Sequence, residues 1–198
     1  MIVLKSLAQS GILIPDDLAA ADPARVGGKA AGLARLRDAG CNVPPWFVVT
    51  PDCNDDAAVE AALARLGAPA CHPEAPPCHP ELVEGRATIA TFAVRSSAHI
   101  EDGTTTSCAG RFATLLFVSD DGVLDAIRRV RASSDDPMPV IVQCMVDGTV
   151  SGVAFGIDPV DGSDVVVVTA APGLACGIVD GDAITDTWRV TRDGTIAA

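Results

Sequence analysis

The chain lacks several features by which common classes of protein are recognised. It contains no Tyr, and aromatic residues make up only 4% of its 198 residues, so a base-stacking platform for single-stranded nucleic acid is not expected. Basic residues are also few, because 14 Lys and Arg stand against 26 Asp and Glu, for a formal net charge of -12. That balance disfavours nucleic acid and anionic membrane surfaces as partners. No run of uncharged apolar residues is long enough to predict a membrane span.

Two further patterns of the sequence predict the cellular compartment of the protein. The seven Cys are an odd number and lie partly in apolar segments such as IVQCMV, which favours buried free thiols over a disulfide framework. The N-terminal segment MIVLKSLAQSGILIPDDL lacks the basic start, the continuous apolar stretch and the small-residue cleavage site of a signal peptide. We therefore predict a cytoplasmic protein.

Hydrophobic residues, 48% of the chain, suffice for one cored domain or for two small lobes that share a site. Helices are predicted at 29–40, at 57–67 with Asp55 or Asp56 as cap, and at 122–132 with Ser119 or Asp120 as cap. Short runs rich in Val and Ile predict strands at 46–50, 88–97, 111–118, 138–146, 150–157, 164–171 and, more weakly, 186–194. Strands outnumber helices without regular alternation, which predicts the α+β class.

Residues 69–86, PACHPEAPPCHPELVEGR, interrupt this pattern with closely spaced Pro and two copies of Cys-His-Pro-Glu. We expect an inserted surface loop here. Cys71, His72, Cys78 and His79 are ligand types for zinc, so a metal-binding module is one alternative, although adjacent Cys-His pairs fit one tetrahedron poorly. The segment HPELVEGR also resembles peptides translated from bacterial dispersed repeats, which would make it an inserted passenger.

The segment Gly27-Gly28-Lys29 stands at the entrance to the first predicted helix. Two glycines allow backbone N–H groups to turn toward an anion, the helix N-terminus is partially positive, and Lys29 adds a full charge. It is not a Walker A loop, because the upstream Gly spacing is absent and Ala30 stands where that motif has Ser or Thr. The alternative is a solvated Lys beside an ordinary Gly turn.

A second segment places Arg95, Ser96 and Ser97 at the end of a predicted strand, followed by a small-residue stretch, TTTSCAG, that ends at Gly110. An arginine offers a planar fork for phosphate oxygens, and hydroxyls and loop amides supply further donors. In the alternative interpretation Arg95 pairs with Glu101 or Asp102 and only fixes the loop. Both interpretations are compatible.

A third segment contains Gln143, Met145 and Val146 in an apolar strand. Met145 could supply an apolar surface for a purine, and backbone groups could bind the edge of the base. The alternative is a core strand with one polar residue.

Together these segments resemble the phosphoenolpyruvate synthase and pyruvate, phosphate dikinase family. The matching stretches are VGGKAAGLARLRDAGCNVPPWFVVT, FAVRSSAHIEDGTTTSCAGRFATLLFV, MPVIVQCMVDGTVSGVAFGIDP and, more weakly, APGLACGIVDGDAITDTWRV. The resemblance implies an ATP-grasp fold, two α+β lobes that bind ATP, here at about 1–136 and 137–198. It also implies that Lys29 and Arg95 hold phosphates, that the loop ending at Gly110 covers them, and that Gln143, Met145 and Val146 line the adenine.

The resemblance further implies Mg²⁺ as a cofactor, through ligands that the sequence leaves unknown, and a phosphohistidine swivelling domain as a partner in cis or in trans. That domain would pass the phosphate to pyruvate or another acceptor. The chain departs from the family at Ala175-Cys176, where Gly-Glu is usual, and in a short connection between Val118 and Met138. It also ends before the family's later acidic strand, so we expect an incomplete phosphotransferase. The alternative is a degenerate nucleotide-binding regulatory protein without turnover.

Overall fold

The computed structural model describes residues 7–18, 23–66, 91–97, 113–146, 148–174, 178 and 184–197. The chain forms two compact units, one of Met1–Glu74 with Val83–Met145 and one of Ala75–Leu82 with Val146–Ala198. The inserted loop predicted at 69–86, with its Cys-His pairs, and the loop ending at Gly110 lie outside the described residues. Within the described ranges, no helix is both long and apolar enough to cross a membrane.

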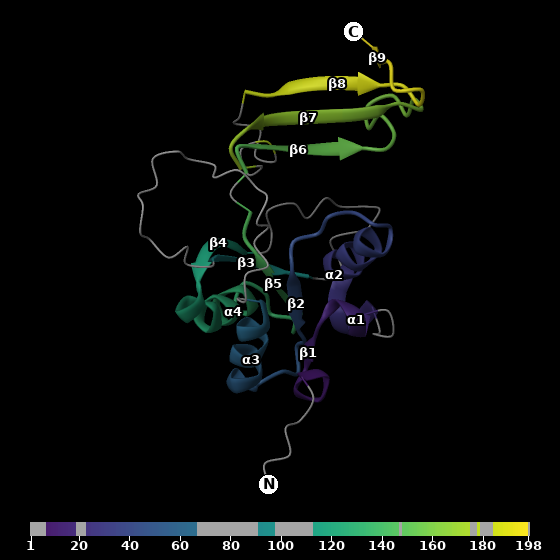
Figure 1. The fold of residues 1–198 in the computed structure, drawn as a ribbon. Helices are drawn as coiled ribbons and strands as arrows, with labels where there is room; N and C mark the ends of the chain where they lie inside the picture. The colour runs from purple at the N-terminus through teal and green to yellow at the C-terminus, as the bar shows by residue number, and fades with distance from the viewer. Residues whose placement is uncertain are drawn as a thin grey trace. The chain divides into compact units, whose positions relative to one another are not determined.

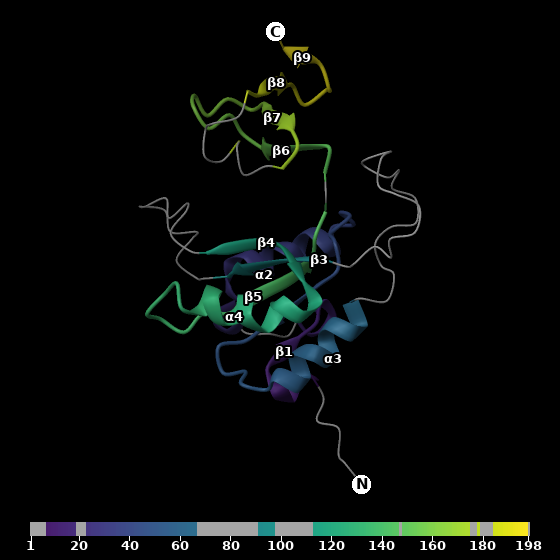
Figure 2. The same ribbon diagram turned by 90° about the vertical axis from the view of Figure 1, so that its left-hand side faces the viewer.

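The first unit contains an antiparallel sheet with strand order β1-β2-β5-β3-β4. Helices α3 and α4 lie on one side of this sheet and α2 on the other (Figures 1 and 2). Its elements are η1 (Leu7–Ser10), β1 (Ile12–Leu13), α1 (Pro15–Leu18), α2 (Pro23–Asp38), β2 (Trp46–Val49), α3 (Asp56–Leu66), β3 (Thr91–Ser96), β4 (Thr114–Ser119), η3 (Asp120–Gly122), α4 (Val123–Arg131) and β5 (Val140–Cys144).

Two hydrophobic clusters cover the two faces of this sheet. Side chains of α3 and α4 pack on one face around Phe47, Phe92 and Val142, and this first cluster includes Cys144, which is buried as predicted. On the other face, side chains of α2 pack in a smaller second cluster around Ile141. Alternate residues of a strand point to opposite faces, so each central strand contributes to both clusters. Burial on both faces explains why these strands are almost continuously apolar.

Helix ends follow local chemistry. The backbone N–H of Ala58 donates to the Asp55 carboxylate at 3.1 Å, so Asp55 caps α3, as one of the two predicted alternatives had it. At the end of α2, Gly40 has φ 82°, and the N–H of Cys41 donates to the carbonyl of Leu36 at 2.9 Å. This left-handed glycine cap is the stop that the sequence predicts.

The predicted cap of the α4 region is wrong. A turn of 3₁₀ helix, η3, precedes α4, and Gly122 at the N-cap position of α4 provides no side chain. The hydroxyl of Ser119 instead donates to the Asp121 carboxylate. Sequence spacing did not reveal this turn, because a 3₁₀ turn and the first turn of an α-helix favour the same polar residues.

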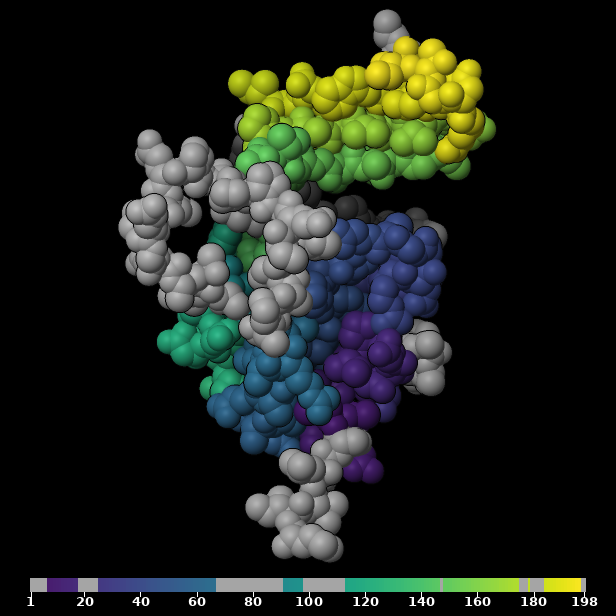
Figure 3. All heavy atoms as spheres, in the orientation of Figure 1, coloured from purple at the N-terminus to yellow at the C-terminus, as the bar shows by residue number. Residues whose placement is uncertain are grey.

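The second unit contains an antiparallel sheet with strand order β6-β7-β8-β9. Its strands are β6 (Val150–Phe155), β7 (Val166–Pro172), β8 (Asp186–Val190) and β9 (Ile196–Ala197). Among the described residues of these strands only Ala171 is buried, and both hydrophobic clusters found in the described residues belong to the first unit. Atoms of β6, β7 and β8, green to yellow, reach the visible surface of this sheet (Figure 3).

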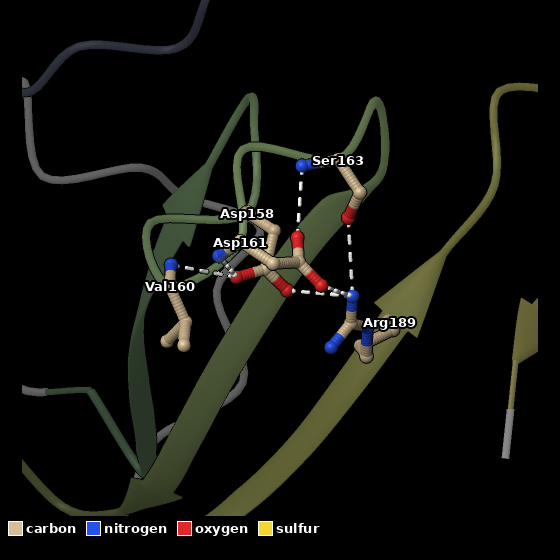
Figure 4. Close-up of polar contacts among 5 residues, drawn as sticks. All are labelled: Asp158, Val160, Asp161, Ser163 and Arg189. Carbon is tan, nitrogen blue, oxygen red and sulfur yellow. Dashed lines mark hydrogen bonds and ion pairs between the residues drawn. The ribbon is translucent and has the colours of Figure 1, made fainter.

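A polar network fixes the connection between β6 and β7 to β8 (Figure 4). Asp158 is 3% exposed, accepts the N–H of Val160 at 2.8 Å, and forms an ion pair with Arg189 at 2.9 Å. Asp161 accepts the N–H of Ser163 at 2.8 Å and pairs with the same guanidinium. Hydrogen bonds from Ser163 and from the guanidinium of Arg189 lower the pKa of the Asp161 carboxyl below its ordinary value.

The α+β class is confirmed, and every predicted helix and strand has a counterpart among these elements. The division into units differs from the predicted one, because it falls after Met145 instead of near residue 136. The reason is β5, which pairs with β2 on one side and β3 on the other and so belongs to the first unit.

Candidate nucleotide-binding site

Two of the predicted residues lie on one face of the first unit's sheet, and the helix that contains a third packs against that face. Arg95 in β3 lies directly opposite Ile141 in β5, and residues opposite each other in an antiparallel pair share a face. Ile141 packs in the second cluster with Ala30, which follows Lys29 in α2. Gln143 lies two residues beyond Ile141 on β5 and therefore shares that face. Fold topology thus brings residues of three distant segments to the α2 side of the sheet.

The Gly-Gly-Lys segment is a break within α2. Gly27 has φ 77° and ψ 169°, so the regular helix that contains Lys29 begins after it, at Gly28. A Cβ on Gly27 would lie 1.4 Å from the carbonyl oxygen of Ser97. Only glycine fits here, both because of the left-handed φ and because of the close approach of the Ser97 backbone. The segment with Lys29 is therefore in direct contact with the end of the strand that contains Arg95.

A buried hydrogen bond joins the same two segments. The N–H of Ala30 donates to the hydroxyl of Ser97 at 3.0 Å, and Ser97 is fully buried. Sequence reasoning considered Ser97 only as part of the Arg-Ser-Ser segment and missed this contact. The only feature of the sequence that could have indicated this contact is the second serine of the Arg-Ser-Ser segment.

Ser96 lies differently from its neighbours. It is fully buried and opposite Val140, which belongs to the first cluster. Strand alternation places its side chain on the α3 and α4 side, the opposite face from Arg95. Its predicted contact with the nucleotide therefore requires its backbone, and it stays a prediction.

The residues predicted to line the adenine lie at the end of β5. Gln143 is buried and its side-chain amide donates to the carbonyl of Pro44 at 3.3 Å. The N–H of Met145 donates to the carbonyl of Thr91 at 2.9 Å, and its side chain is half-buried. Val146 is 57% exposed and belongs to the second unit.

The cavities near these elements adjoin α4 instead. One of about 540 Å³ is lined by β4 and α4, and one of about 170 Å³ lies between α3 and α4. None of the predicted site residues that the structure describes lines either cavity. Nor do the described residues contain a group of three or more His, Cys, Asp or Glu that could hold a metal ion.

Comparison with known proteins identifies the family of the chain. The sequence pattern of the pyruvate phosphate dikinase AMP/ATP-binding domain matches residues 80–137 and 133–197, more than half of the chain. The chain belongs to this family. The pyruvate phosphate dikinase pattern includes β3 with Arg95 and β5 with Gln143, and the two matched stretches meet in the connection between α4 and β5.

Individual relatives extend the likeness to most of the chain. A prodigiosin synthesizing transferase, PigC, of Serratia marcescens is 34% identical, over 86% of this chain and 22% of that protein. A probable phosphoenolpyruvate synthase of Methanothermobacter thermautotrophicus is 28% identical, over 89% and 33%. A rifampicin phosphotransferase of a Streptomyces species is 32% identical, over 96% and 28%.

The chain therefore spans between about a fifth and a third of the length of these relatives. The alignments to the synthase and to the rifampicin enzyme extend over 228 and 242 residues, more than the whole chain, so these relatives contain residues that this AMP/ATP-binding domain lacks. Their names differ in the molecule that the enzyme makes or modifies.

Proposed function

We propose that this domain binds ATP on the α2 side of the first sheet, with Lys29 and Arg95 holding the phosphates. The observation that supports this most strongly is the contact of Gly27 and Ala30 with Ser97, which links the two cationic segments. Phosphate groups are favoured by the N-terminus of a helix and by charge-assisted donors, and both occur together here. In this proposal Gln143, Met145 and Val146 line the adenine, and the loop ending at Gly110 covers the phosphates.

We further propose that the domain acts within a phosphotransferase in which ATP phosphorylates a carrier histidine on another domain. Membership of the family supports this proposal, and so do relatives named as a phosphoenolpyruvate synthase and a rifampicin phosphotransferase. In this proposal the final acceptor, pyruvate or another molecule, is set by parts of the phosphotransferase other than this domain.

Magnesium belongs to the proposal only as a companion of ATP. The described residues contain no cluster of carboxylates that fits a metal held by the protein alone. Mg²⁺ commonly binds substrate phosphates with one or two carboxylates and water, so its charge would reach the site on the nucleotide.

Calorimetry with MgATP tests the proposal. Replacing Lys29 or Arg95 by Ala removes one charge-assisted contact, which we expect to cost about 1.5–3 kcal/mol, a roughly ten- to hundredfold loss of affinity. The matched control is Arg37→Ala, which removes a positive charge from the same helix, where Arg37 pairs with Asp16 and Asp38. Equal MgATP binding by wild type and Lys29→Ala/Arg95→Ala would refute the nucleotide site.

A nucleotide-binding protein without turnover is the second candidate. It is supported by Cys176, which stands where the family pattern usually has Glu. The discriminating experiment adds a separate phosphohistidine domain and labelled ATP to the purified chain. Phosphate transfer to that domain supports the phosphotransferase, and MgATP binding without any transfer supports the regulatory alternative.

A further inference from the structure

The helix that contains Lys29 obtains its N-terminal cap from another strand. Gly27 occupies the N-cap position, where Ser, Thr, Asp or Asn normally supplies an oxygen to the third N–H of the helix. Gly27 has no side chain, and the third N–H, that of Ala30, is bound at 3.0 Å by the hydroxyl of Ser97. The hydroxyl of Ser97, from another segment of the same chain, thus supplies the cap that the side chain of the N-cap residue supplies in most helices.

We propose that Ser97 is a positioning residue that fixes Lys29 relative to Arg95 for binding of the ATP phosphates. This inference rests on the nucleotide site proposed above. Ser97 lies two residues from Arg95, and it holds the amide of the residue that follows Lys29. Any shift of the helix start along or away from the strand therefore moves one cation with respect to the other.

Contacts with the sheet fix the position of Ser97 itself. The N–H of Ser97 donates to the carbonyl of Pro139 at 2.9 Å, directly before β5, and the residue is fully buried. Gly27 packs against the Ser97 backbone so closely that no Cβ would fit. The sheet thus determines where Ser97 lies, and Ser97 determines where the helix begins. Fixing two cations in advance reduces the ordering cost of binding a phosphate group.

The first test replaces Ser97 by Ala in the full chain. We expect MgATP binding to weaken about three- to tenfold, because loss of a cap oxygen loosens the helix start. The matched control is Thr50→Val, which also removes a buried hydroxyl bond within the first unit, from Thr50 to the carbonyl of Gly11 at 2.9 Å. Both variants should lower the melting temperature, and only Ser97→Ala should weaken MgATP binding.

The second test asks whether Ser97 acts through Lys29. Titrations followed by NMR, which measure millimolar dissociation constants, compare Ser97→Ala in the wild-type and Lys29→Ala backgrounds. We expect the loss of affinity to fall to less than about twofold once Lys29 is absent, since coupled residues are not additive.

The outcomes separate this inference from the proposed function. Equal losses in the two backgrounds, or a loss matched by Thr50→Val, would show that Ser97 has only a structural role. Binding that depends on Lys29 but not on Ser97 would overturn the inference and leave the proposed function intact. MgATP binding that depends on neither Lys29 nor Arg95 would refute both this inference and the proposed function.

Discussion

The two units are built from the same kind of antiparallel sheet but are stabilised in different ways. In the first unit, helices cover both faces and two hydrophobic clusters form. In the second, Val150 and Ile196 are 65% and 62% exposed, and a polar network around Asp158 fixes the loop between β6 and β7. Similar Val-rich runs are therefore buried in the first unit and more exposed in the second, because burial depends on what covers a strand and not on the sequence of the strand alone. Lys29 and Arg95 lie in the unit whose sheet is covered on both faces.

The largest expected effect comes from a matched pair of phenylalanines. Phe92 is fully buried in the first cluster, whereas Phe155 in the second unit is 45% exposed. Phe92→Ala leaves a cavity and should lower the free energy of unfolding of the first unit by about 3–5 kcal/mol. Phe155→Ala should cost about 1 kcal/mol or less in the second unit.

The chain has two Trp, Trp46 in the first unit and Trp188 in the second, and no Tyr. In a Trp188→Phe background, urea unfolding followed by fluorescence reports the first unit alone. Hydrogen exchange measures the stability of the second unit. Comparable losses of unfolding free energy in Phe92→Ala and Phe155→Ala, each in its own unit, would contradict the difference between the units.

An intermediate effect is expected for Asp158→Ala. The substitution removes the acceptor for the N–H of Val160 and the ion pair with Arg189, which should cost the second unit about 1–3 kcal/mol. The control is Asp164→Ala, whose exposed pair with Arg192 should contribute about 0–1 kcal/mol. Amide hydrogen exchange should accelerate in β6, β7 and β8 and remain unchanged in β2 and β5. Acceleration in β5 would mean that the two units do not unfold separately.

The smallest expected effect is a dependence on pH. Hydrogen bonds from Ser163, with Arg189, lower the folded-state pKa of Asp161 below its ordinary value of 3.8. The stability from this group is therefore complete above that value and is lost as the pH falls through the lower folded-state pKa. Asp161→Asn should make the stability of the second unit depend less on pH below about pH 4. Unfolding followed by fluorescence in a Trp46→Phe background, at several acidic pH values, checks this. Identical slopes of the unfolding free energy against pH with and without Asp161→Asn would contradict it.

Local signals in the sequence were sufficient for the regular elements. Val- and Ile-rich runs predicted β2 and β5, and Asp55 and Gly40 gave helix ends that the structure contains. Very short elements were not predictable in this way. The strand β1, Ile12–Leu13, has two residues, too few for any periodicity.

Long-range pairing explains what the sequence did not reveal. The division between the compact units after Met145 was not predictable, because nothing in residues 137–145 shows that β5 inserts between β2 and β3. The role of Ser97 depends on the same pairing, since it arises only when the end of β3 lies against Gly27. The resemblance placed Lys29 and Arg95 in one site, but the residue that joins their segments required the three-dimensional arrangement.

The position of β5 also has a consequence for synthesis of the chain. It is the last strand of the first unit in sequence, yet the central strand of that sheet, and it joins the β1–β2 pair to the β3–β4 pair. Its partners in β2 lie about ninety residues earlier, a separation typical of slow pairing. Until residue 144 leaves the ribosome, a nascent chain holds two half-sheets with open edges, which are prone to associate with other chains. The first unit is thus completed only once its last strand has been synthesised, and a pause just before β5 is the point at which aggregation of this unit is most expected.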